Sequence, residues 1–149
     1  MTDTPRESAT LVLMRDRGSG APEVLMVQRH ANDAFAGGAF VFPGGVLEES
    51  DCAPESLALS EGLSPEAARA ALGSVESGGR ALGFYLAAIR ETFEEVGVLL
   101  ARTAAGDPWR PSPEQAEPLR RARSELREEH RERQFGGGWQ RKSAVSSRS

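Results

Sequence analysis

The segment that most constrains this chain is residues 90–98, which read RETFEEVGV. On a helix, successive residues are about 100° apart, so Glu91, Glu94 and Glu95 fall within an arc of about 100°. Apolar residues fall on the opposite side of the same helix, and they are Leu82, Tyr85, Leu86, Ile89, Phe93 and Val96. The pattern predicts an amphipathic helix that packs one face against a sheet and presents carboxylates on the other.

The carboxylate face is compatible with a metal platform. Glu91 and Glu95 are like charges four residues apart, which costs a few tenths of a kcal/mol unless a cation lies between them. A divalent metal ion would be such a cation. Upstream, residues 42–45 read FPGG, which predicts a sharp glycine turn that leads into an acidic stretch. Glycines there allow a backbone carbonyl to approach a ligand closely. The alternative is an ordinary solvated helix face.

Together the two segments resemble the Nudix box of the Nudix hydrolases, which reads G-x5-E-x7-R-E-U-x-E-E-x-G-U, where U is aliphatic or bulky and apolar. Gly45 is followed by five residues and then Asp51, where the family has Glu, and Thr92 stands at a usually apolar position. Between Asp51 and Arg90 lie 38 residues instead of seven, so the box contains an insertion at about residues 52–80. A box split in this way resembles the Nudix subgroup that includes mammalian peroxisomal coenzyme A diphosphatases.

This resemblance implies an α/β fold, the Nudix α/β/α sandwich with a mixed sheet, and hydrolysis of a diphosphate linkage with Mg²⁺ or Mn²⁺ as cofactor. The implied metal ligands are the Gly44 carbonyl, Glu91, Glu94 and Glu95. The implied catalytic residues are these three glutamates together with Arg90, which we expect to orient the glutamates through a salt bridge to Glu94. Which carboxylate activates the attacking water stays open.

The candidate substrate-binding residues are Arg29 and Gly45. Arg29 ends an apolar run and precedes a loop, so it is placed to contact phosphate or adenine in a family-like site. The role of Asp51 stays open. We expect a small-molecule nucleotide as partner, with coenzyme A or acyl-CoA as one candidate and other nucleotide diphosphates as alternatives, and neither nucleic acid nor a membrane.

Turn signals divide the remaining sequence into short elements. Apolar runs separated by glycine and proline predict strands, and these runs are Ala9 to Arg15, Glu23 to His30 and Ala39 to Phe42. Ser64 and Pro65 predict the start of a short helix that continues to Leu72. The long helix is predicted from about Arg80 to Val96, after a break at Ser77-Gly78-Gly79.

Composition indicates one soluble domain, since the chain has 149 residues, 39% hydrophobic residues and a formal net charge of −4. The single cysteine, Cys52, has no partner for an internal disulfide, and no apolar run approaches the ~20 residues of a membrane span. The polar N-terminus lacks the layout of a signal peptide. We therefore expect a cytoplasmic location.

The sequence changes character after the long helix. Residues 9–102 are predicted to form the Nudix-like domain, whereas residues 107–149 are rich in proline and charge and predict a poorly ordered tail. Three explanations are open: a truncated or frameshifted product, which we favour, a basic arm for an acidic partner, or a helix that folds back. A fold incomplete at its C-terminus would expose a sheet edge, which predicts low stability or homo-oligomerisation. The alternative function is that of a truncated, inactive Nudix-like remnant or binding module.

Overall fold

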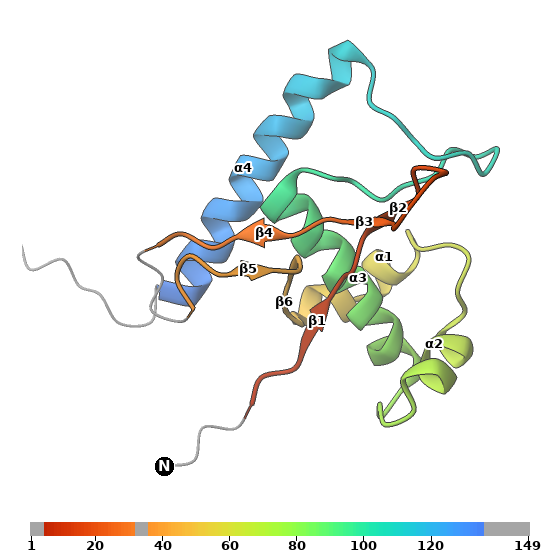
Figure 1. The fold of residues 1–149 in the computed structure, drawn as a ribbon. Coiled ribbons are helices and arrows are strands. Elements are labelled where there is room, and N and C mark those ends of the chain that lie inside the picture. The colour runs from red at the N-terminus through yellow and green to blue at the C-terminus, as the bar shows by residue number, and fades with distance from the viewer. Residues whose placement is uncertain (1–4, 32–35, 136–149) are drawn as a thin grey trace, which may run out of the picture. The chain divides into compact units, whose positions relative to one another are not determined.

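The computed structural model describes residues 5–31 and 36–135, and it divides into two compact parts, Met1–Arg110 and Pro111–Ser149. The described strands and the glutamate-bearing helix all belong to the first part (Figure 1). No helix in the described part of the chain is long and apolar enough to cross a membrane.

In the described residues of the first part, six short strands form three antiparallel pairs. The pairs are β1 (Ser8–Thr10) with β6 (Gly44–Val46), β2 (Met14–Arg15) with β3 (Glu23–Val24), and β4 (Val27–Gln28) with β5 (Phe40–Val41). Each of the three segments predicted as strands therefore contains strand structure. The predicted runs are longer than the strands, and the first two of them are each interrupted.

The FPGG segment differs from the prediction of a glycine turn. Phe42 and Pro43 connect β5 to β6, whereas Gly44 and Gly45 lie inside β6. A Cβ atom on Gly44 would lie 2.3 Å from the Ala9 carbonyl oxygen. Glycine is therefore needed at this position because strand β6 lies too close to β1 for any side chain.

Three helical elements precede the long helix. They are the 3₁₀ helix η1 (Glu49–Cys52), α1 (Pro54–Leu57) and α2 (Pro65–Leu72). The prediction for α2 is confirmed, since the Ser64 side chain accepts a hydrogen bond from the Ala67 N–H and Gly73 follows the last residue. Ser64 satisfies a backbone N–H group at the start of the helix, and Gly73 ends it. Both effects are local, so they can be predicted from the sequence.

Helix α3 (Gly78–Val96) begins two residues earlier than predicted. Its N-cap is Ser77, whose hydroxyl oxygen accepts a hydrogen bond from the Arg80 N–H at 3.2 Å. Gly78 and Gly79 therefore belong to the first helical turn. The C-terminal end is as predicted, because Gly97 adopts the left-handed conformation with φ of 76°.

Helix α3 is the central element of the first part and contacts β1, β6, η1, α1 and α2 (Figure 1). The predicted division into one packing face and one exposed face is wrong. Glu91 and Glu94 are buried, while Tyr85 from the predicted apolar face is exposed. Small buried residues in the same helix explain the difference, because Ala81, Gly83 and Ala87 let other elements approach it on several sides.

The second part contains helix α4 (Pro113–Phe135), where the sequence predicts a poorly ordered tail. Pro113 occupies the first helical position, where the missing N–H is not needed. The Ser112 N–H donates to the Gln115 side chain at 2.9 Å, which supports the helix start. The remainder of the predicted tail, residues 136–149, lies outside the described residues, and the domain boundaries stay predictions.

Candidate metal centre on helix α3

Arg90 connects the two halves of the split box. Its Nε and Nη2 atoms donate to the two carboxylate oxygens of Asp51, each at 2.9 Å. Nη2 also donates to the Val46 carbonyl oxygen at 3.0 Å. Nη1 donates to Glu91 at 3.0 Å and to Glu94 at 3.1 Å. One guanidinium thus joins η1, the end of β6 and two glutamates of α3.

Asp51 has a defined place in this network, which the sequence left open. It is the third residue of η1, and its Oδ2 atom also accepts a hydrogen bond from the Glu48 N–H at 2.9 Å. The residue is only 4% exposed. The signal that pointed to it was its spacing from Gly45, which matches the first acid of the Nudix box.

Two opposing effects set the protonation equilibrium of Arg90. Burial acts to lower its pKa, whereas the hydrogen bonds and negative charge of Asp51, with further charge from Glu91, raise it by more. The net result is a pKa above the ordinary arginine value. Arg90 is therefore a permanent cation within this group of carboxylates.

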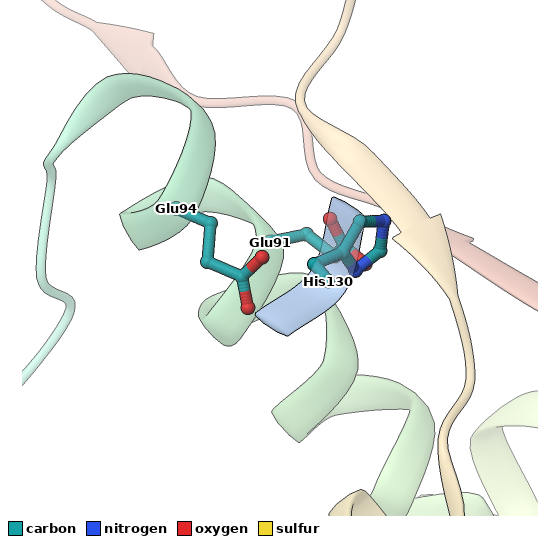
Figure 2. Close-up of side chains that lie close together, drawn as sticks. All are labelled: Glu91, Glu94 and His130. Atoms are coloured by element: carbon teal, nitrogen blue, oxygen red, sulfur yellow. The ribbon is translucent and has the colours of Figure 1, made fainter. Parts of the chain in front are cut away.

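Glu91 and Glu94 project from one side of α3, as Figure 2 shows, and each is 3% exposed. A carboxylate oxygen of Glu91 lies within 4.8 Å of one of Glu94. Both residues belong to the first part of the molecule. His130, which Figure 2 also labels, belongs to helix α4 of the second part.

Gly45 is explained by its position against Glu91. A Cβ atom on Gly45 would lie 2.2 Å from the Glu91 carboxylate carbon. The predicted substrate-binding role of Gly45 therefore stays a prediction, while the structure gives this glycine another role. Its bare Cα leaves the space that the Glu91 carboxylate occupies.

Glu95 and Gly44 also lie next to each other. The Gly44 N–H donates to Glu95 at 3.3 Å. The Pro43 carbonyl accepts a hydrogen bond from the Leu11 N–H, and the Leu47 N–H donates to the Glu7 carbonyl, each at 2.9 Å, on the two sides of the β1–β6 pairing. In this antiparallel register, in which Gly44 lies opposite Thr10, the N–H and the carbonyl of Gly44 face away from β1. The Gly44 carbonyl therefore points to the same side of β6 as the N–H that contacts Glu95.

Thr92 is fully buried between these glutamates along the helix, at a position where the Nudix box is usually apolar. Its hydroxyl donates to the Ala88 carbonyl oxygen at 2.7 Å. Because this bond satisfies the hydroxyl within the helix itself, threonine fits an apolar position without another partner.

The donor set fits a hard divalent cation. Glu91, Glu94, Glu95 and the Gly44 carbonyl supply only oxygen atoms, which Mg²⁺ and Mn²⁺ prefer. Among the described residues, three carboxylates contact Arg90, and Glu95, one residue after Glu94, accepts a hydrogen bond from the Gly44 N–H.

The other predicted substrate residue, Arg29, follows strand β4 and is half-buried. Its N–H donates to the Ala39 carbonyl at 2.9 Å, and its own carbonyl accepts from the Gly38 N–H at 3.2 Å. These bonds hold the backbone at the base of the loop between β4 and β5. A contact between the Arg29 side chain and substrate stays a prediction.

Comparisons with known proteins identify the family of this chain. Residues 5–134 match the family described as the NUDT19 Nudix domain. The chain is 35% identical over 125 residues to the acyl-coenzyme A diphosphatase NUDT19 of Gallus gallus, covering 64% of this chain and 32% of that protein. The chain therefore spans about a third of the length of this curated relative.

A solved structure shows the same fold. The crystal structure of a NUDIX hydrolase from Alicyclobacillus acidocaldarius is 30% identical, with a TM-score of 0.59, and the match covers 81% of this chain and 51% of that one. The predicted α/β Nudix-like fold is confirmed by this similarity. The family match also extends beyond the predicted domain, since it includes most of helix α4. The chain belongs to the NUDT19 Nudix domain family of the Nudix hydrolases.

Proposed function

We propose that this chain is a metal-dependent hydrolase that cleaves a diphosphate linkage in a nucleoside diphosphate derivative, with coenzyme A or acyl-CoA as the first candidate substrate. The observation that carries the proposal is the contact of Arg90 with Asp51, Glu91 and Glu94. This contact assembles both halves of a Nudix box that are 39 residues apart. Family membership alone would not require that assembly in a chain with an insertion inside the box.

The proposed ligands of Mg²⁺ or Mn²⁺ are Glu91, Glu94, Glu95 and the Gly44 carbonyl. When bound, such an ion neutralises diphosphate charge and favours ionisation of a bound water. The protein must mainly position its own groups for this reaction, because phosphoryl-transfer catalysis depends on placement and electrostatics more than on covalent chemistry. The hydrogen bonds of Arg90 provide that placement for two of the three glutamates.

Arg90 acts in this proposal as a positioning residue and does not contact substrate. Five hydrogen bonds from its guanidinium already go to protein groups, namely both Asp51 oxygens, the Val46 carbonyl, Glu91 and Glu94. One glutamate accepts a proton from the attacking water. Arg29 and Gly45 are the proposed substrate-binding residues, with Arg29 placed to contact phosphate.

The substrate class rests on the chicken relative, which is described as an acyl-coenzyme A diphosphatase. In the proposed reaction, the oxygen of water forms a bond to one phosphorus atom of the diphosphate. The bond from that phosphorus to the bridging oxygen breaks, so two phosphomonoesters are released and the protons of water are shared between products and solvent.

Cytoplasmic location and homo-oligomerisation stay predictions.

A second candidate function is a Nudix-like module that binds a nucleotide without hydrolysing it. The observation that favours this alternative is the length of the match, because the chain covers only 32% of the chicken relative. This candidate predicts nucleotide binding in the presence of Mn²⁺ and no product.

A substrate panel separates the two candidates. Purified chain is incubated with coenzyme A, acetyl-CoA, ADP-ribose, NADH and nucleoside triphosphates, with Mg²⁺, Mn²⁺ or EDTA, and products are separated by chromatography. The proposal predicts cleavage of coenzyme A compounds that EDTA abolishes and that Glu94→Gln reduces by at least about a hundredfold. Folded protein that binds coenzyme A but cleaves no member of the panel would support the binding module.

A further inference from the structure

Gly83 lies in α3 at the point where η1 contacts the helix. A Cβ atom at this position would lie 2.5 Å from Cys52 Sγ, 3.4 Å from the Asp51 carbonyl oxygen and 3.5 Å from Leu47 Cδ1. Glycine is less favourable than alanine inside a helix. Because Gly83 has no positive φ angle, its backbone conformation does not require glycine, whereas the packing of Cys52 does.

The same face of α3 carries both this contact and the network of Arg90. Gly83 and Arg90 are seven residues apart, which is about two helical turns, so they lie one above the other on one face. Helix η1 contacts α3 along this face. Cys52 packs at Gly83, while the adjacent residue, Asp51, reaches Arg90.

We propose that Gly83 and Cys52 are positioning residues for the candidate metal centre. The bare Cα of Gly83 forms a notch that Cys52 Sγ fills, and this contact holds η1 close enough to α3 for Asp51 to bind Arg90 with both oxygens. Arg90 in turn orients Glu91 and Glu94. The identity of the ion that those glutamates bind rests on the proposed function, whereas the contact itself does not.

The thiol of Cys52 is suited to this packing role. Burial is the largest influence on it and raises its pKa above the ordinary cysteine value. At neutral pH the notch is therefore filled by the uncharged thiol, which packs as a small apolar group.

The test is a rescue experiment on the folded full chain. Gly83→Ala adds the clashing Cβ, and Cys52→Ala removes the sulfur that it meets. Mn²⁺ affinity is measured by electron paramagnetic resonance, and thermal unfolding by circular dichroism. We expect Gly83→Ala to weaken Mn²⁺ binding by about 10- to 100-fold, as for other residues that orient metal ligands, and to lower Tm. We expect the double variant to recover both to within about threefold and a few degrees of the wild type.

A matched control is Gly79→Ala in the first turn of the same helix. Its Cβ would meet only Leu57 Cδ1, at an ordinary contact distance of 3.4 Å. This variant should bind Mn²⁺ like the wild type. Two results would overturn the proposal: a double variant as impaired as Gly83→Ala, or wild-type Mn²⁺ affinity and stability in Gly83→Ala itself.

A double-mutant cycle tests whether Gly83 acts through Asp51, and this experiment requires no metal. Gly83→Ala is combined with Asp51→Asn, and the free energy of unfolding is measured in urea. Positioning through the ion pair predicts that Gly83→Ala costs clearly less stability when Asp51 is already changed, whereas independent packing predicts additive losses. If the wild type binds no Mn²⁺, the proposed metal site fails, while the rescue of Tm and this cycle still decide the role of Gly83.

Discussion

Asp51 and Arg90 form a two-bonded ion pair between residues that are 39 positions apart in sequence, with both N–O distances at 2.9 Å. The side chains of both residues are largely buried, with exposed fractions of 5% and 15%. The inserted segment begins directly after Asp51 and ends before Arg90 in the sequence, so its length does not disturb the pairing. The ion pair thereby restores in space the proximity that an unsplit Nudix box has in sequence.

The first prediction concerns the stability that depends on this pair. Asp51→Asn removes one charge from a buried pair and leaves Arg90 without its strongest partner, which should cost about 3 kcal/mol of unfolding free energy. Urea unfolding followed by circular dichroism measures the loss. Glu49→Gln is the matched control, because this residue lies in the same 3₁₀ helix with a side chain 93% exposed. Equal effects of the two variants would show that the ion pair contributes nothing specific.

The second prediction concerns the space in front of Glu91. Gly45→Ala would place a Cβ atom 2.2 Å from the Glu91 carboxylate carbon, so the carboxylate must move. We expect Mn²⁺ affinity to fall at least about tenfold in equilibrium binding measurements, because an oriented ligand is displaced. Gly79→Ala should leave the affinity unchanged. Undiminished Mn²⁺ binding by Gly45→Ala would mean that Glu91 is not a ligand in its observed orientation.

The third prediction concerns Thr92. Thr92→Val keeps the volume and removes the hydroxyl, while the Ala88 carbonyl retains its helical hydrogen bond from the backbone of residue 92. Unfolding free energy should therefore change by less than about 1 kcal/mol. Calorimetric unfolding provides the measurement. A loss of several kcal/mol would indicate that the hydroxyl serves another buried group.

The fourth prediction concerns pH. The hydrogen bond from Arg80 lowers the pKa of Glu7, so the folded-state pKa is below the unfolded one. The contribution of this ion pair to stability is then present above the ordinary carboxyl pKa and is lost as pH falls through the lowered value. The Tm difference between wild type and Glu7→Gln should be present at about pH 7 and should shrink between about pH 5 and pH 3. A pH-independent difference for Glu7→Gln would contradict the assignment.

The parts of the fold that could be predicted are those set by local chemistry. The caps of α2 and the end of α3 at Gly97 depend on neighbouring residues only, and both were correctly predicted. The start of α3 was placed too late because two glycines usually indicate a break. Here Ser77 caps the helix and Gly78 lies against Pro65, where a Cβ would lie 2.8 Å from the Pro65 Cβ.

The parts of the site that could not be predicted depend on packing between distant segments. The helical wheel placed Glu91 and Glu94 on an exposed face, but both are buried, with Gly45 of strand β6 against Glu91 and Arg90 in contact with both. The role of Asp51 was equally hidden, since 38 residues separate it from Arg90. Such contacts follow from the tertiary fold, and neither propensity nor periodicity carries information about them.

The most direct test of the central claim is Mn²⁺ binding to the wild-type chain and to Glu94→Gln, followed by electron paramagnetic resonance at equal protein concentration. Glu55→Gln serves as the control, because it makes the same chemical change at an exposed position in α1. We predict saturable Mn²⁺ binding that Glu94→Gln weakens at least about tenfold, on the order of a lost metal ligand, and that Glu55→Gln leaves unchanged. Equal Mn²⁺ affinities of all three folded proteins, or no binding to the wild type, would contradict the assignment of a metal centre to helix α3.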